Sequence, residues 1–133
     1  MNKRNLSLLS VLVILAAMVL TACGPKAVTL DVELKDFSFE PAAWEVPAGA
    51  KVTLNLTNTG SQEHEYVIMV LGKDATPPFD ADDEPNVFWE HEVAPGGTAT
   101  VEFTAPTEPG VYNVACGTAG HLEQGMHGTL TVK

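Results

Sequence analysis

The sequence predicts an all-β protein, an antiparallel Greek-key β-sandwich of about eight strands. Short segments alternate between apolar and polar side chains, turns rich in Pro and Gly separate them, and the domain lacks helical periodicity of useful length. An immunoglobulin-type sandwich has a similar strand count, but neither tryptophan fits the spacing of its Cys–Trp–Cys core. A single domain over residues 28–133 is therefore expected.

Four strands are expected in the first half of this domain, at residues 28–39, 44–46, 51–58 and 64–71. Residues 28–35 and 51–58 alternate strictly, which is typical of a strand with one buried face. Residues 64–71 are apolar on both faces, which predicts a strand in the middle of the sandwich.

Four more strands are expected in the second half, at residues 87–93, 98–104, 112–116 and 128–132. Between the halves, residues 72–85 lack periodicity and predict a long surface loop. Its acidic run at residues 80–84 would suit a cation or a basic partner. Because the run lacks the spacing of an EF-hand loop, a solvated loop is the favoured interpretation.

A glycine-rich segment near the C-terminus holds three candidate metal ligands, Cys116, His121 and Met126. Thiolate and thioether are soft donors and imidazole is borderline, so this set favours copper over magnesium, calcium or manganese. A blue-copper site needs a second histidine, and the best candidate is His64, which opens a predicted strand after a polar turn. Each donor alone is more often a packing or surface residue, so the inference depends on their combination.

With these residues in view, the sequence resembles the cupredoxins, the small blue copper proteins, over roughly residues 28–133. A strand-borne His precedes Cys-x4-His-x4-Met and a final Gly-x-Leu-x-Val, a pattern similar to the plastocyanin-, auracyanin- and sulfocyanin-like proteins of prokaryotes. The resemblance implies one type 1 copper ion held by His64, Cys116, His121 and Met126. It also implies one-electron transfer between redox proteins, rather than an enzymatic reaction, as the activity.

Glu65 departs from that family, many of whose members have Asn directly after the first His. A looser site would release copper more readily, so a surface copper carrier or chaperone is the alternative function. A copper nitrite reductase is not expected, because it would need a second copper site and a longer chain.

The other histidines, His91 and His127, are expected to face solvent rather than to bind the metal. His121 is expected to be the ligand nearest the surface. It would lie beside Leu122 in an apolar rim suited to transient docking of a partner.

Residues 1–22 have the pattern of a secretory signal, with an apolar run shorter than the ~20 residues of a membrane-spanning helix. The sequence Leu20-Thr-Ala-Cys23 resembles the lipobox of bacterial lipoproteins. This implies lipidation of Cys23, a tether over residues 23–27, and a membrane-anchored protein of the cell envelope that faces the periplasm or the cell exterior. The alternatives are a plain signal peptide and a Cys23–Cys116 disulfide, which the surrounding His and Met disfavour.

The charge balance is acidic, with 7 basic and 17 acidic residues and a net charge of −10. Without residues 1–22 the chain would keep 5 basic and 17 acidic residues, a net charge of −12. Such a domain is a poor nucleic-acid binder and would attract a basic redox partner, for example a basic cytochrome. Solubility explains the charge equally well. The protein is expected to be a monomer.

Overall fold

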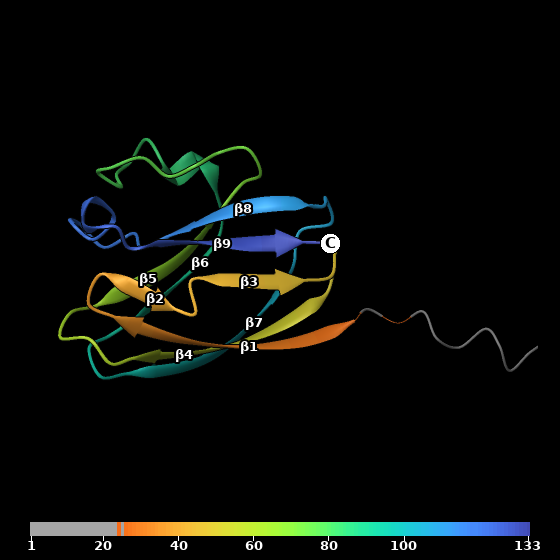
Figure 1. The fold of residues 1–133 in the computed structure, drawn as a ribbon, viewed down its shortest axis with the longest axis horizontal. Coiled ribbons are helices and arrows are strands. Elements are labelled where there is room, and N and C mark those ends of the chain that lie inside the picture. The colour runs from red at the N-terminus through yellow and green to blue at the C-terminus, as the bar shows by residue number, and fades with distance from the viewer. Residues whose placement is uncertain (1–23, 25) are drawn as a thin grey trace, which may run out of the picture.

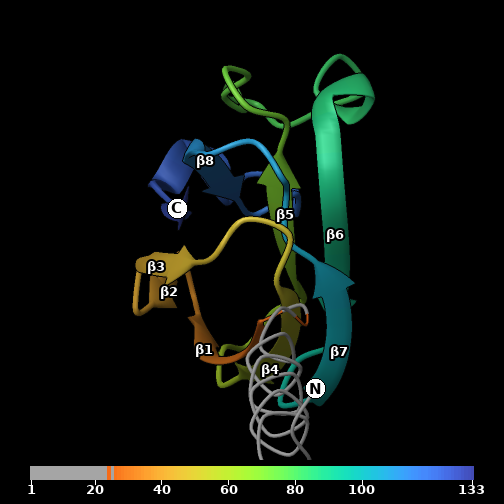
Figure 2. The same cartoon turned by 90° about the vertical axis from the view of Figure 1, so that its right-hand side faces the viewer.

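Two β-sheets packed face to face form the fold, in a computed structural model that describes residue 24 and residues 26–133 (Figures 1 and 2). The predicted signal segment and the predicted lipidation site, Cys23, lie outside the described residues. The strands in the described part are β1 (Ala27–Lys35), β2 (Ser38–Glu40), β3 (Ala43–Val46), β4 (Lys51–Asn58), β5 (His64–Met69), β6 (Val87–Val93), β7 (Thr98–Thr104), β8 (Gly110–Ala115) and β9 (His127–Val132). Two short 3-10 helices accompany them, η1 (Glu84–Asn86) and η2 (Leu122–Gln124). Among the described residues, none of the helices is long and apolar enough to cross a membrane.

The strand order is β2-β1-β4-β7 in one sheet and β3-β9-β8-β5-β6 in the other. The predicted all-β sandwich is confirmed, but its expected antiparallel character is wrong for two pairs, because β1–β4 and β3–β9 are parallel. The physical reason is a crossover. After β2 the chain passes Pro41, which has no N–H to donate to a ladder, and β3 then joins the opposite sheet. The chain returns to β4 running in the direction of β1.

The structure has nine strands rather than about eight, because the expected strand at residues 28–39 is two strands. A turn at Asp36 and Phe37 separates β1 from β2, and Phe37 adopts a left-handed backbone with φ 67°. This turn lies at the same end of the sandwich as the start of β5 (Figure 1), so Asp36 comes within hydrogen-bond distance of His64.

The core fills the space between the sheets with alternate side chains of the facing strands. Leu34, Leu54 and Ile68 are completely buried, and Phe39, Trp44 and Tyr66 pack edge to face with ring centroids 5.2 to 6.1 Å apart. Each such buried side chain contributes about 1.5–3 kcal/mol relative to an exposed one. This close packing holds β5 and β8 in fixed positions relative to each other.

The outer face of β5 is also covered, which confirms the prediction of a central strand buried on both faces. Val67 and Met69 pack there with Ala115, Leu122 and Phe79, the last of which comes from the long loop between β5 and β6. That loop is as long as expected, and most of its acidic run is exposed.

Asp83 is the exception within the acidic run. It is buried, and its two carboxylate oxygens accept hydrogen bonds from the backbone N–H groups of Thr76 and Asp80, both at 3.2 Å. At this residue the acidic run organises the loop instead of being solvated.

Candidate metal centre

The four predicted ligands come from two distant parts of the chain that meet at one end of the sandwich. His64 is the first residue of β5, and Cys116 follows the last residue of β8. His121 stands directly before η2, and Met126 directly before β9. All four are at most 1% exposed.

The loop from Cys116 to Met126 is closed by its own backbone. The Cys116 N–H donates to the Met126 carbonyl at 3.0 Å, and the Met126 N–H donates to the His121 carbonyl at 3.1 Å. Gly125 ends η2 with φ 91°, a conformation that favours glycine. The short helix and the glycine therefore return the chain to β9 beside the thiol.

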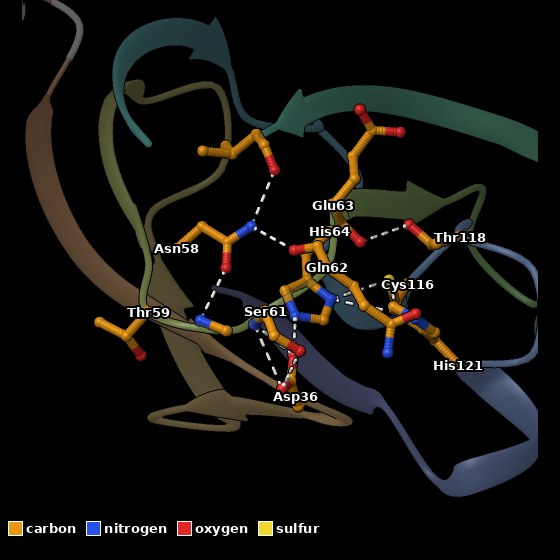
Figure 3. A network of polar contacts seen from close by, with 12 residues as sticks. Asp36, Asn58, Thr59, Ser61, Gln62, Glu63, His64, Cys116, Thr118 and His121 are labelled. Carbon is orange, nitrogen blue, oxygen red and sulfur yellow. Dashed lines mark hydrogen bonds and ion pairs between the residues drawn. The ribbon is translucent and has the colours of Figure 1, made fainter. Parts of the chain in front are cut away.

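Three donor atoms converge at this end (Figure 3). His64 Nδ1 lies 3.1 Å from His121 Nδ1, and Cys116 Sγ lies 3.9 Å and 3.4 Å from these two nitrogens. In the described part of the chain, no other group of three His, Cys, Asp or Glu side chains meets in this way. Metal–ligand bonds of about 2.0–2.3 Å place two donors of one ion about 3–4 Å apart, so these separations fit a single ion.

The fourth donor, Met126, is completely buried in the same cluster as Cys116. Two imidazole nitrogens, one thiolate and one thioether are the donor set of a type 1 copper site, and copper is the metal that this site fits. The role of each side chain as a ligand remains a prediction.

Each histidine is oriented through its second ring nitrogen. His64 Nε2 lies 3.2 Å from Asp36 Oδ1, and His121 Nε2 lies 3.4 Å from Gln62 Oε1. Asp36 accepts hydrogen bonds from the Ser61 hydroxyl and backbone N–H, which hold the pKa of its carboxyl below the usual value. Both Nδ1 atoms are thereby left to face the thiol.

The thiol of Cys116 lies beside the first residues of β5. The Glu65 N–H points at Cys116 Sγ over 3.5 Å, and the Thr118 hydroxyl donates to the Glu63 carbonyl at 3.1 Å, which ties the loop to the strand. Burial raises the pKa of Cys116, although the hydrogen bonds from Glu65 and Thr118 oppose this. Burial, followed by the nearby His64, lowers the pKa of His121, which favours the neutral imidazole that a metal requires.

Glu65 directly follows His64, where the resemblance to the cupredoxins leads one to expect Asn. Its carboxyl lies so close to Gly117 that a Cβ there would collide with Oε2. Burial, and then the negative charges of Glu90, Glu84 and other nearby acids, raise the pKa of Glu65 to about 7.

His121, expected to be the ligand nearest the surface, does not present an exposed edge. His121 is only 1% exposed, because Gln62 lies at its Nε2 and the ring of Phe37 packs edge to face against it, with centroids 5.2 Å apart. Leu122 does not form an exposed rim either, since it is buried against the outer face of β5.

The remaining histidines stay outside the cluster, as expected. His127 is exposed, as predicted. His91 is half-buried rather than solvent-facing, because its ring stacks on Trp89 with centroids 6.2 Å apart.

Sequence patterns did not identify the residues that orient the histidines. Asp36 and Phe37 look like part of a continuous strand, and the segment from Asn58 to Gln62 looks like an ordinary polar turn. One signal was available. If the alternation that buries Leu34 continued, residues 36 and 38 would also be buried, but these are the polar Asp36 and Ser38. The structure buries Phe39 instead, so the alternation shifts by one residue between Leu34 and Phe39, as expected where a turn interrupts a strand.

Comparisons with known proteins agree with this geometry. The model of the family described as cupredoxin-like domain matches residues 8–132. No curated protein matches the sequence. Among solved structures, a dithionite-reduced auracyanin from Roseiflexus castenholzii is 28% identical at a TM-score of 0.66. The match covers 83% of this chain and 99% of the auracyanin chain. Auracyanin B is 27% identical at a TM-score of 0.68, and the match covers 84% of this chain and 93% of the auracyanin B chain.

A third structure is auracyanin A, a "blue" copper protein from the green thermophilic photosynthetic bacterium Chloroflexus aurantiacus. It is 26% identical at a TM-score of 0.66, covering 80% of this chain and 99% of its own. A multicopper oxidase is 22% identical at a TM-score of 0.57, and only 43% of that chain is covered, so this likeness concerns the fold alone.

Proposed function

We propose that this chain, which belongs to the cupredoxin-like family, is a blue copper protein that carries single electrons between larger redox proteins. One copper ion held by His64, Cys116, His121 and Met126 would alternate between Cu(I) and Cu(II). The observation that carries the proposal is the convergence of two Nδ1 atoms and one Sγ within 4.8 Å in a buried pocket. The solved structure of a "blue" copper protein with the same fold supports it.

The chain's own residues would serve electron transfer by restricting movement around the ion. Electron transfer is fast when the two oxidation states need little rearrangement of the ligands. Here β5 and β8 arise from a close-packed core, and hydrogen bonds hold both imidazoles through their outer nitrogens. Met126 and the hydrogen bond from Glu65 to the thiolate would tune the potential.

The alternative of a copper carrier is less well supported. It rested on a looser site at Glu65, yet the Glu65 N–H still points at Cys116 Sγ, and Thr118 ties the loop to β5. The donors are also buried, whereas a carrier must present them to an acceptor protein. Rapid transfer of Cu(I) to a chelator would favour the carrier, and reversible voltammetry without copper loss would favour the electron shuttle.

The membrane anchor and the partner are part of the proposal. A lipid on Cys23 would tether the protein in the cell envelope, facing the periplasm or the cell exterior. The described chain enters at the end of the sandwich where the Lys26 carbonyl accepts from the N–H of Lys51, the first residue of β4, and the Lys133 carbonyl accepts from the Ala48 N–H. The start of β5 and the loop between β8 and β9, which hold the donors, lie at the opposite end (Figure 1). The site would then face away from the membrane, toward a basic partner, and the protein would act as a monomer without enzymatic activity.

An absorption and spin-resonance spectrum of the copper-loaded protein tests the proposal. Intense visible absorption from charge transfer between thiolate and copper is expected, and Cys116→Ser should abolish it. A colourless copper complex, or a spectrum that Cys116→Ser leaves unchanged, would overturn the proposal.

A further inference from the structure

We propose that Asp36 is a positioning residue of the metal centre, which fixes the imidazole of His64 and lowers the reduction potential of the bound copper. The inference rests on the proposed function, because it concerns the same ion. It adds a residue from the turn between β1 and β2 to the chemistry of a site whose predicted ligands all come from β5 and the C-terminal loop.

The contact is placed on the outer side of the imidazole. His64 Nε2 faces Asp36 Oδ1 at 3.2 Å, while Nδ1 on the opposite side of the ring faces His121 and Cys116 (Figure 3). A carboxylate accepts a hydrogen bond, so the proton of the neutral ring belongs on Nε2. That tautomer leaves the lone pair of Nδ1 free for a metal. His64 is completely buried, whereas the Asp36 side chain is 36% exposed, so the carboxylate stands between the imidazole and solvent.

Asp36 is itself held by a second segment. The Ser61 N–H donates to Oδ1 at 2.9 Å, and the Ser61 hydroxyl donates to Oδ2 at 2.9 Å. Gly60, which directly precedes Ser61, lies so close that a Cβ there would collide with both Asp36 Oδ1 and His64 Nε2. The carboxylate is therefore clamped against the ring by the turn that precedes β5.

The same turn also contacts the other histidine. Phe37 follows Asp36 and packs its ring edge to face on His121, at an interplanar angle of 86°. It does so with φ 67°, which is a genuine outlier for a bulky residue and persists only where the surroundings hold it. One turn thus lies against both imidazoles.

The expected effect follows from charge. A carboxylate hydrogen-bonded to a ligating imidazole makes the ring a stronger donor, and its negative charge favours Cu(II) over the less positive Cu(I). Loss of such a partner typically weakens metal binding by about 10–100-fold. Because the loss is greater for Cu(II) than for Cu(I), the reduction potential rises.

Asp36→Asn in the full chain tests the inference, since Asn keeps the size of Asp and removes the charge. Asp31→Asn is the matched control, because it removes the same charge from β1 and its carboxylate likewise accepts a hydrogen bond, from Asn55 at 2.8 Å. Asp36→Asn should raise the potential and weaken Cu(II) binding about tenfold or more, measured by redox titration and chelator competition. Nitrogen NMR of the metal-free wild type should show His64 as a single Nε2–H tautomer, which Asp36→Asn can keep because its amide oxygen also accepts a hydrogen bond. Asp31→Asn should match the wild type in all three measurements.

The inference is overturned if a folded Asp36→Asn keeps the wild-type potential and Cu(II) affinity, or if Asp31→Asn changes them equally. It is also overturned if His64 of the metal-free wild type does not hold its proton on Nε2. Should Asp36→Asn fail to fold, Ser61→Ala carries the test, because it removes one anchor and keeps the carboxylate. A smaller shift in the same direction supports the inference, and unchanged values overturn it. Failure of the wild type to bind copper would refute the proposed function, while the NMR measurement would still report on the contact between Asp36 and His64.

Discussion

The buried thiol of Cys116 and the buried imidazole of His121 are both driven toward their neutral forms before metal binds. Burial raises the pKa of the thiol and lowers that of the imidazole. A neutral imidazole is ready to bind, but a metal must displace the proton of the thiol. Copper uptake by this site therefore releases a proton.

The apparent affinity for copper should consequently increase with pH. Below the pKa of the Cys116 thiol, release of one proton makes binding about tenfold tighter for each pH unit. Chelator competition at several pH values, corrected for the chelator's own protonation, measures the slope. A flat profile over neutral pH would contradict a buried, protonated thiol.

Glu65 should make the stability of the metal-free protein fall as the pH rises. Its pKa is raised from 4.5 to about 7, so the native state binds the proton more tightly than the unfolded chain does. The stabilisation is complete below about pH 4.5 and is lost as the pH rises to about 7. Because the side chain is only partly buried, solvent screening reduces the effect, and we expect about 1 kcal/mol.

Glu65→Gln should therefore raise the free energy of unfolding at pH 8 and leave it nearly unchanged at pH 4. Denaturant titrations at both pH values measure this, with the exposed Glu102→Gln as the control. Equal effects of the two substitutions at pH 8 would argue against a specific role of burial at Glu65.

The turn between β4 and β5 is the element that presents His64 to the site. Asn58 ends β4 almost fully buried, donates to the Gln62 and Val93 carbonyls at 2.8 and 2.9 Å, and accepts from the Gly60 N–H at 2.9 Å. These bonds set the path of the segment that carries Ser61 and Gln62. Ser61 holds the Asp36 carboxylate beside His64, and Gln62 contacts His121 Nε2.

Asn58→Ala should destabilise the protein by about 2–3 kcal/mol, because it removes three hydrogen bonds, one of them buried and two partly buried. Asn55→Ala is the control, since its side chain makes two hydrogen bonds and both of them are exposed. It should cost less than about 1 kcal/mol. Unfolding of the metal-free proteins by denaturant measures both, and similar costs would refute the role of the buried turn.

Most elements were predictable because alternation of apolar side chains directly reports a half-buried strand. Residues 51–58 coincide with β4, and residues 87–93 and 98–104 coincide with β6 and β7. The parallel pairs were not predictable in this way, because alternation is the same in either direction. The four donor types were conspicuous in the sequence, whereas Asp36 became part of the site only through the crossover that brings its turn beside β5.

At the scale of the whole molecule, the acidic charge should govern encounters with partners. The net charge is −10 over the full sequence, and attraction between such a protein and a basic protein accelerates association at low salt. The Debye length shortens from about 30 Å at 0.01 M to about 10 Å at 0.1 M salt, so this attraction is largely screened as salt is added.

Electron exchange between the copper-loaded protein and a basic cytochrome should therefore slow at least several-fold between these salt concentrations. Stopped-flow measurement of the second-order rate tests this, with an acidic cytochrome as the control, for which the rate should increase with salt. If both rates are independent of salt, the charge serves solubility instead.

An anomalous-scattering map at the copper edge, from crystals of the copper-loaded protein, tests the central claim most directly. The account predicts one strong peak within bonding distance of His64 Nδ1, Cys116 Sγ and His121 Nδ1, with Met126 as the remaining neighbour. A peak elsewhere, for example at His91 or His127, or the absence of copper between these donors would contradict it.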